Sequence, residues 1–358
     1  MSYNLYITAD KIGTPTGGGA VTFHESTALA TLGDLKIVRP DDSIRDPFAQ
    51  DTSVLHQCQA ILDEADSPPK LAHCYAGCFT ETVAYLKRQG VRVTYTAAAH
   101  DIKLSRQEHE RLGLGYDYQH LNDPALWDLY IKGYQDADML ICPSQHSALV
   151  MKEFECKQPI EVIPHGHTPV SQFPMLPEMF TVGYLGAMGP DKGLWSLLAA
   201  WKKLGYQDAS LLLAGRDSAT DWCVSLIGRF GGGNIHLAGW QQNVSHFYNS
   251  ISVYCQPSFT EGFGIEVLEA MAHARGVICS QGAGAHDVIG MHGCSYPAGD
   301  VDKLAGLIDQ YKFNWEMLER DGQKNLLESG KYTWERIRNR YVLVWRLLSI
   351  PAIIMSDR

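Results

Sequence analysis

The chain has 358 residues, of which 45% are apolar and 20% are charged, and its formal net charge is −10. This composition is ordinary for a soluble globular protein, and the acidic balance argues against a nucleic-acid binder, which would usually carry a basic surplus. At roughly 150 residues per domain, the length predicts about two domains, each with its own core. No run of 18 apolar residues is present, so no membrane-spanning helix is expected.

The cysteines and the amino-terminal residues indicate the cellular compartment in which the protein is expected. Nine cysteines are scattered singly with no C-x-x-C pair, and the first residues show neither a basic region nor a long apolar stretch. Unpatterned cysteines indicate reduced thiols, and a start of this kind predicts no signal peptide. We therefore expect a cytoplasmic protein.

Short apolar runs alternate with helix-like segments from the amino-terminus onward. Residues 3–9 predict a strand, and the run GTPTGGGAV after it predicts a glycine-rich loop that opens a helix. Further buried strands are expected in this half of the chain at residues 35–40, 71–77, 91–100, 137–144 and 160–166. This alternation predicts a parallel sheet with helices on both faces.

The same alternation restarts in the second half. Residues 168–179 contain three prolines and little periodicity, which predicts a linker, and residues 191–204 have the pattern of a helix. Strands are expected at residues 180–187, 209–215, 234–239, 252–258 and 276–280. We therefore expect two doubly wound α/β domains, residues 1–167 and 180–331, that face each other across a ligand-binding cleft.

The last segment, residues 332–358, is expected to contain a helix that stops near Pro351 and packs across both domains. Tryptophans and valines alternate there with four arginines, Arg336, Arg338, Arg340 and Arg346. A second interpretation is an amphipathic helix that contacts a membrane, which would place the protein peripherally at the inner face of that membrane. We favour the packing helix and leave the membrane contact open.

The segment PSFTEGFGIEVLEAMAHARGVICS, residues 257–280, gives the strongest indication of chemistry. Gly262 and Gly264 let the backbone approach a ligand without a Cβ clash, and the helix expected from Gly264 offers free N–H groups to an anion. The carboxylates of Glu261 and Glu269 can each accept two hydrogen bonds from a sugar diol. This spacing suits a nucleotide-sugar, which has a phosphate bridge between two sugars.

This segment resembles the signature of retaining glycosyltransferases with the GT-B fold, especially glycosyltransferase family 4, whose pattern is E-G-F-G followed by E-A-M-A. Glu261–Gly264 and Glu269–Ala272 match, although the proline that usually follows is absent. Other segments resemble family landmarks in the same order: TPTGGGAV, YTAAAHD, CPSQHSA, VIPHG, GYLGAMGPDKG and LLLAGRDS. The resemblance spans roughly residues 3–290 and implies two Rossmann-like domains that transfer a hexose-type sugar from a nucleotide-diphosphate donor.

The resemblance also implies roles for individual residues. Glu269 would bind the ribose, Lys192 would bind the diphosphate, and Glu261 with the Phe263–Gly264 backbone would meet hydroxyls of the donor sugar. His100 would contact that sugar near the reacting centre, so His100 and Glu261 are the expected catalytic residues. The donor-binding set that the resemblance implies further includes Gly18, Gly19, Gly186, Ser258 and Gly262.

One departure from the family pattern concerns the diphosphate. Family members often carry an arginine that binds the diphosphate together with the lysine, but Ala187 stands at that position. Our hypothesis is that Arg216, at the next strand end, replaces it. No metal site is expected, because His100 and His109 lack the spacing of a helical H-E-x-x-H site and the family usually needs no metal.

The expected donor is a UDP-, GDP- or ADP-sugar, bound as a substrate, with no cofactor, and the acceptor is a hydroxyl on a glycan, a lipid-linked compound or a small molecule. Two alternatives stay open: a nucleotide-sugar epimerase or hydrolase of the same shape, and a weakly active sugar-nucleotide binding module. A dinucleotide dehydrogenase is disfavoured, because GTPTGGGAV does not follow the G-x-G-x-x-G pattern.

Overall fold

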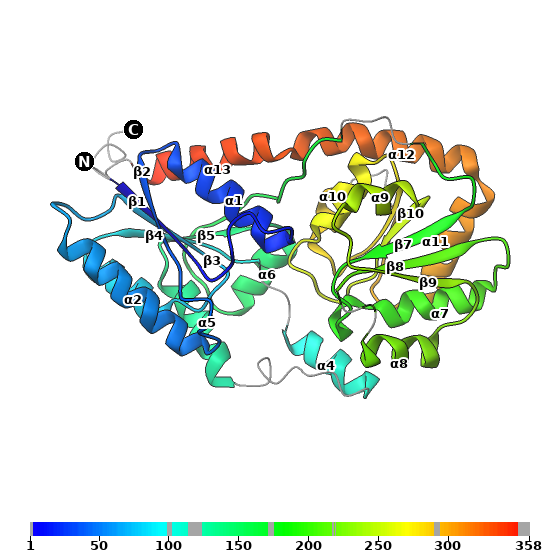
Figure 1. The fold of residues 1–358 in the computed structure, drawn as a ribbon, viewed down its shortest axis with the longest axis horizontal. Coiled ribbons are helices and arrows are strands. Elements are labelled where there is room, and N and C mark those ends of the chain that lie inside the picture. The colour runs from blue at the N-terminus through cyan, green and yellow to red at the C-terminus, as the bar shows by residue number, and fades with distance from the viewer. Residues whose placement is uncertain are drawn as a thin grey trace.

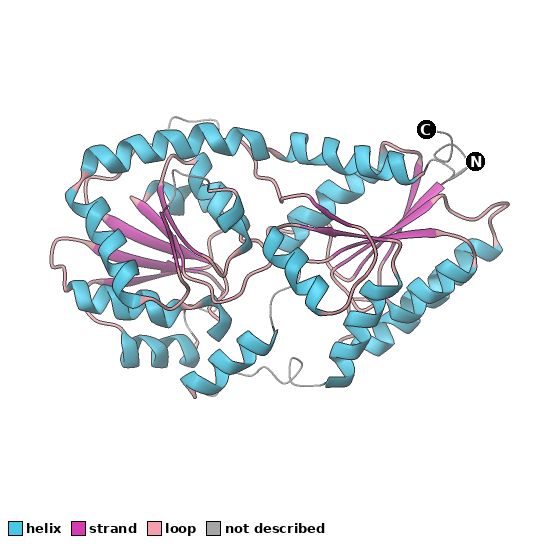
Figure 2. Cartoon of the chain, turned by 180° about the vertical axis from the view of Figure 1, so that it is seen from behind, coloured by secondary structure: helices cyan, strands magenta, loops and turns pink. Residues whose placement is uncertain are grey.

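The structure is a computed structural model that describes residues 3–98, 102–113, 124–170, 175–216, 218, 220–289 and 294–349. Two parallel sheets lie beside each other, and helices cover the faces of both (Figure 1). The view from behind shows the same arrangement, with the strands of each half enclosed between helices (Figure 2). The predicted alternation of strands and helices is therefore confirmed.

The first sheet has the strand order β2-β1-β3-β4-β5-β6, and its neighbours pair in parallel. The order reverses between β1 and β3, and ligands bind at such a switch point in open α/β sheets. The strands are β1 (Tyr3–Thr8), β2 (Asp34–Val38), β3 (Leu71–Tyr75), β4 (Arg92–Thr96), β5 (Met139–Cys142) and β6 (Ile160–Val162). The helices are α1 (Gly17–Ala30), α2 (Pro47–Asp63), α3 (Thr80–Arg88), α4 (Ile102–Leu112), α5 (Pro124–Asp136) and α6 (Gln145–Glu153).

The second sheet has the order β12-β11-β10-β7-β8-β9, also parallel, and reverses between β7 and β10. Its strands are β7 (Thr181–Leu185), β8 (Ser210–Ala214), β9 (Ile235–Gly239), β10 (Val253–Gln256), β11 (Gly276–Ser280) and β12 (Cys294–Tyr296). The helical elements are η2 (Pro190–Lys192), α7 (Leu194–Leu204), α8 (Asp221–Phe230), α9 (Val244–Asn249), α10 (Ile265–Ala272), η3 (Gly284–Asp287), α11 (Val301–Phe313), α12 (Trp315–Ser329), η4 (Gly330–Tyr332) and α13 (Trp334–Leu348).

The helix expected over residues 191–204 begins later than predicted. Lys192 ends the 3₁₀ turn η2, and α7 starts at Leu194. Gly193 separates the two elements with a φ of 66°, and a Cβ at this position would lie 2.0 Å from the carbonyl oxygen of Pro257. Only glycine fits both conditions. Lys192 is therefore held on a turn that packs against the Pro257 loop.

The end of the chain connects the two halves. Helix α12 packs on α10 and β11 of the second half, whereas α13 packs on α1 of the first (Figure 1). The α13 residues that are buried recur at helical spacing, and they are Trp334, Ile337, Tyr341 and Trp345. Pro351 lies outside the described residues, as do residues 171–174 of the predicted linker, so the domain boundaries stay a prediction.

Helix α4 comes from the first half of the sequence but contacts the second. The indole N–H of Trp195 donates to Glu108 over 3.2 Å, and the guanidinium of Arg111 lies 4.1 Å from the Trp195 ring centroid. Arg229 donates to the carbonyl of Leu112 over 2.6 Å, and the Leu112 side chain belongs to the core of the second half. The sequence patterns did not predict this contact between α4 and the second half of the chain.

A polar network is buried behind the first sheet. The Glu25 carboxylate, on α1, accepts hydrogen bonds from Tyr6 at 2.8 Å and from Thr96 at 2.7 Å, and it lies 3.2 Å from Nε2 of His73. The side chains of Glu25 and His73 are fully buried. A buried carboxylate persists only when such partners replace water, so this network ties α1 to β1, β3 and β4.

Among the described residues, none of the helices combines the length and the apolar character that crossing a bilayer requires.

Candidate functional site

Two adjoining cavities lie between the two halves of the chain. The wide cavity, of about 540 Å³, is lined among others by Thr16, Gly186, Arg216, Trp240, Gln241 and Glu269. The inner cavity, of about 240 Å³, is lined among others by Gly18, Tyr75, His165, Lys192, Glu261 and Phe263. Both cavities contact Gly17, Ala187, Ile265 and Glu266, so they meet at the start of α10.

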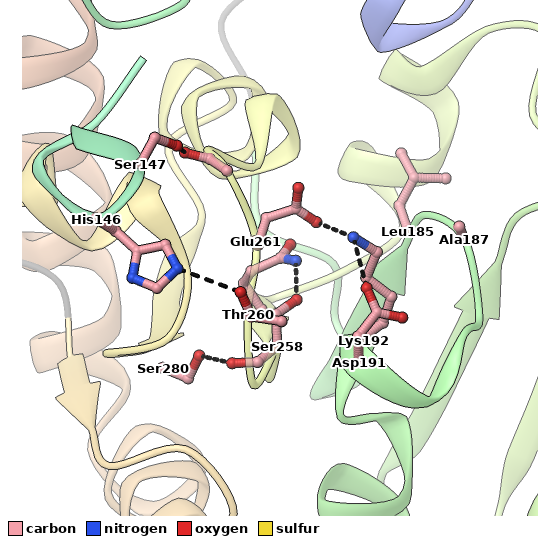
Figure 3. Close-up of polar contacts among 12 residues, drawn as sticks. His146, Ser147, Leu185, Ala187, Asp191, Lys192, Ser258, Thr260, Glu261 and Ser280 are labelled. Atoms are coloured by element: carbon pink, nitrogen blue, oxygen red, sulfur yellow. Dashed lines mark hydrogen bonds and ion pairs between the residues drawn. The ribbon is translucent and has the colours of Figure 1, made fainter. Parts of the chain in front are cut away.

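An ion-paired lysine occupies the wall of the inner cavity. Nζ of Lys192 lies 2.5 Å from Oε2 of Glu261 and 3.3 Å from Oδ2 of Asp191 (Figure 3). Burial alone would lower the pKa of Lys192, but the two carboxylates raise it well above its ordinary value. Lys192 therefore stays protonated, and the two carboxylates hold its ammonium group in place before any ligand arrives.

The Glu261 loop is anchored by its backbone. The N–H of Glu261 donates to the carbonyl of Gly282, and the N–H of Gly284 donates back to the Glu261 carbonyl, at 3.0 and 2.9 Å. Gly264 then turns the chain into α10 with a φ of 96°, a value that favours glycine. The predicted glycine-rich loop followed by a helix is thus present at the predicted place.

Helix α10 places two acids beside the wide cavity. Tyr248 donates a 2.8 Å hydrogen bond to Glu269, and burial raises the pKa of Glu269 to about 7. Burial, with the charges of Glu261 and Glu269, raises the pKa of Glu266 to about 8. Sequence reasoning selected Glu269 and missed Glu266, although its position three residues earlier puts it on the same helix face.

The amino-terminal glycines begin α1, and each has its own neighbour. Thr16 caps the helix by accepting from the N–H of Gly19 at 3.0 Å. A Cβ on Gly18 would lie 2.1 Å from the Asp10 carboxylate, and a Cβ on Gly19 would lie 2.1 Å from Oγ1 of Thr14. Gly18 lines the inner cavity, whereas Gly19 is absent from the lining of both and serves this close packing.

The halves touch directly at Gly262. Its carbonyl accepts hydrogen bonds from Ser144 at 2.7 Å and from Ser147 at 2.9 Å, both on the first half. A Cβ on Gly262 would lie 2.5 Å from the carbonyl oxygen of Ala98, which follows β4. The predicted catalytic His100 lies outside the described residues.

His165 is a second cavity residue that sequence reasoning missed. Its ring meets the Phe263 ring edge-on at 5.2 Å, and its Nδ1 has no hydrogen-bond partner within the described part of the chain. Burial lowers the pKa of His165 to about 4, despite the opposing charges of Glu25 and Glu261, so the ring is neutral at pH 7. The run VIPHG marked the segment, but a lone histidine in a loop gave no further signal.

The remaining predicted residues differ in whether they line one of the two cavities. Gly186 and Arg216 line the wide cavity, and the exposed guanidinium of Arg216 lies 5.5 Å from the ring centroid of Trp240. Ala187, at the position where the family that the sequence resembles often has arginine, lies where the cavities meet. Ser258 is buried, accepts a hydrogen bond from Gln256 at 2.8 Å and is absent from both linings.

Within the described residues, no group of three or more His, Cys, Asp and Glu side chains is arranged to hold a metal ion. Among the described residues that line the inner cavity, Lys192 is the cationic side chain.

Comparisons with known proteins point to one class. Residues 179–311 match the family model described as Glycosyl transferases group 1. The O-antigen chain mannosyltransferase B of Escherichia coli is 28% identical over 172 residues, which cover 46% of this chain and 45% of the relative. The chain thus spans about half the length of the curated relatives that it matches first.

Solved structures resemble the whole chain. Sucrose-phosphate synthase from Thermosynechococcus elongatus has a TM-score of 0.78 at 18% identity, over 97% of this chain and 99% of that one. HepE of Anabaena, solved with UDP-glucose, has a TM-score of 0.69 at 16% identity, over 98% and 100%. At such identities the likeness concerns the fold, which is GT-B with two Rossmann-like domains, as predicted.

Proposed function

We propose that the protein is a retaining glycosyltransferase of family 4 that moves a hexose-type sugar from a nucleotide-diphosphate sugar to a hydroxyl acceptor, without a metal ion. The observation that carries this proposal is the Lys192–Glu261 pair beside the start of α10, where the two cavities meet. A cation next to free helix N–H groups favours a bridging diphosphate, and cavities on either side suit a nucleoside and a sugar.

The proposed ligand follows the line of the two cavities. The nucleoside lies in the wide cavity, with its ribose diol on Glu269 and its base beside Trp240 and Gln241. The diphosphate lies where the cavities meet, and the hexose enters the inner cavity beside Glu261 and His165. The HepE structure with UDP-glucose supports a nucleotide-sugar of this kind, and the similarity to the mannosyltransferase supports a transferred hexose.

In the proposed reaction, Lys192 stabilises the negative charge that grows on the leaving diphosphate. Glu261 accepts hydrogen bonds from the sugar hydroxyls and holds the ring in place. The acceptor hydroxyl approaches the same face of the sugar that the diphosphate leaves, and the departing phosphate takes its proton. We propose that His100 contacts the donor sugar during the reaction and that closure of the cleft excludes water.

Arg216→Ala is expected to weaken nucleoside diphosphate binding by about two- to fivefold, because an exposed cation contributes little free energy. The measurement is calorimetric titration with UDP, GDP and ADP. Arg88→Ala, at the exposed end of α3, removes the same charge outside both cavity linings and is the control. Unchanged affinity and turnover in Arg216→Ala would remove Arg216 from the donor site.

The proposal is tested by thermal-shift screening with UDP-, GDP- and ADP-sugars, followed by a transfer assay on the best donor. A ligand that binds the folded state raises the melting temperature by mass action. We expect one base to stabilise the protein and product NMR to show the donor's anomeric configuration. No shift with any donor at saturation would contradict the proposal, and free sugar release with no transfer to any acceptor would favour a hydrolase.

We also propose that α13 contacts an anionic membrane surface peripherally. Its exposed positions include three arginines and two leucines beside one acid and one amide, and they are Glu335, Arg336, Asn339, Arg340, Leu343, Arg346 and Leu347. Such a face suits lipid head groups. Sedimentation with vesicles rich in phosphatidylglycerol tests this contact, and failure to sediment at low salt would contradict it.

A further inference from the structure

An acid lines the place where the proposed diphosphate lies. Glu266, in the first turn of α10, contacts both the wide and the inner cavity. It faces the loop after β7, because a Cβ on Gly186 would lie 4.0 Å from Oε1 of Glu266. Ala187 follows on the same loop, at the position where the family often has an arginine. A carboxyl group therefore stands where a second cation is usual.

An ionised carboxylate at this point would repel a diphosphate. Two like charges about 4 Å apart repel each other weakly in water and several times more strongly in a half-buried cleft. Three explanations are physically consistent with an acid here: the carboxyl is uncharged, it holds a divalent cation between itself and the phosphates, or it points its charge at a hydroxyl.

The surroundings of Glu266 favour the uncharged form. Two acids, Glu261 and Glu269, act on it electrostatically, and Lys192 is the cation that opposes them. That lysine is already paired with Glu261 and Asp191. Three phenols also lie close enough to interact electrostatically with Glu266, namely Tyr184, Tyr248 and Tyr254. With burial and two acids outweighing one shared cation, the pKa of Glu266 rises to about 8.

Within the described residues, the hydrogen bond that the Glu266 carboxyl receives comes from its own backbone N–H, and the contact with Tyr248 is made by the Glu266 backbone carbonyl at 3.2 Å. Its neighbour Glu269 differs, because Tyr248 donates to that carboxylate. The Glu266 carboxyl is therefore available to a ligand, and in its protonated form it is a strong O–H donor to a phosphate oxygen.

We propose that Glu266 is a donor-binding residue that acts as an uncharged carboxylic acid and donates a hydrogen bond to the diphosphate of the nucleotide-sugar. This inference rests on the proposed function. It explains how the site binds a diphosphate with Ala187 in place of the usual arginine: an O–H donor replaces part of what the missing cation would supply. It also makes donor binding depend on pH above neutrality, which an arginine would not.

The test compares Glu266→Gln and Glu266→Ala with the unchanged protein by calorimetric titration of UDP, GDP and ADP between pH 6.5 and 9.5, in EDTA. Glutamine mimics the neutral acid, because it keeps an N–H donor and cannot ionise. For the unchanged protein we expect the Kd to rise about tenfold from pH 7 to pH 9, as the protonated fraction falls. Glu319→Gln, on the exposed face of α12, is the control for the charge change.

At pH 7, Glu266→Gln is expected to bind within about threefold of the unchanged protein and to lose the pH step, whereas Glu266→Ala is expected to bind about tenfold more weakly. A pH step that persists in Glu266→Gln would come from another group, such as Glu269 or the ligand, and would overturn the inference. So would binding at pH 7 that is tenfold weaker in Glu266→Gln, since that result indicates a working carboxylate.

A divalent cation is tested in the same titrations by replacing EDTA with Mg²⁺ or Mn²⁺. Tighter binding with metal in the unchanged protein but not in Glu266→Gln would overturn the neutral acid in favour of a bridging ion. If the unchanged protein binds none of the three diphosphates at any pH, the proposed function itself fails, and the inference fails with it. The titrations can therefore tell a failure of the Glu266 inference apart from a failure of the proposed function.

Discussion

Lys192→Ala is expected to lower kcat/KM for the nucleotide-sugar about 100-fold. A charge-assisted contact between an ammonium and a phosphate contributes about 2–3 kcal/mol in a partly closed cleft, and each 1.4 kcal/mol is tenfold in rate. The ammonium lies 2.5 Å from Glu261 and 3.3 Å from Asp191, so it is positioned without help from the ligand. Steady-state kinetics with the donor found by thermal shift measures the effect.

The split between kcat and KM shows when Lys192 acts. If Lys192 stabilises charge that develops on the leaving group, most of the loss is in kcat, and nucleoside diphosphate affinity falls less. Lys203→Ala is the matched control, because Lys203 is exposed and pairs with Asp302 on the surface of the second half. A Lys192→Ala enzyme with kcat/KM within threefold of the unchanged protein would refute the assigned role.

Glu25→Ala is expected to destabilise the protein by about 3–5 kcal/mol, the usual cost of removing one partner of a buried charged network. The change removes the acceptor of the Tyr6 and Thr96 hydroxyls and the group beside His73, all of them buried. Equilibrium denaturation followed by circular dichroism measures the change. Glu64→Ala, at the exposed end of α2, is the control and should shift the midpoint little.

The Glu25 carboxylate also makes the free energy of unfolding depend on pH, in a direction that follows from its pKa shift. Burial raises the pKa of Glu25, but His73, Thr96 and Tyr6 outweigh it, so the pKa lies below its ordinary value. A group with a lowered pKa stabilises the fold above its unfolded pKa, about 4.3 for glutamate, and loses that contribution as pH falls through the folded value. Below about pH 4, the free energy of unfolding of Glu25→Gln should therefore fall less steeply with decreasing pH than that of the unchanged protein. Equal acid sensitivity in both proteins would contradict this account.

Much of the fold could be predicted because it depends on local patterns. Buried parallel strands are continuous apolar runs, and β3 and β7 bury every residue, so their sequences stood out. The helix α10 followed from Gly264, whose positive φ only glycine adopts readily. The short strand β12 was missed, since three residues carry no period.

Contacts between distant segments could not be predicted in the same way. The motif contained Glu261, but nothing local places it 2.5 Å from Lys192, which is 69 residues away. Helix α4 has an ordinary amphipathic pattern that does not say which half of the chain its apolar face will meet, and Leu112 joins the core of the second half. Glu266 was overlooked because its significance depends on the cavities on either side of it, which only the assembled fold creates.

The most direct measurement is a crystal structure with the nucleoside diphosphate that stabilises the protein most. It should show both phosphates above the first turn of α10 within reach of Lys192, and the ribose hydroxyls on Glu269. Density for the nucleotide at any other place, or a cleft that stays empty at saturating ligand, would contradict a sugar donor bound between the two sheets.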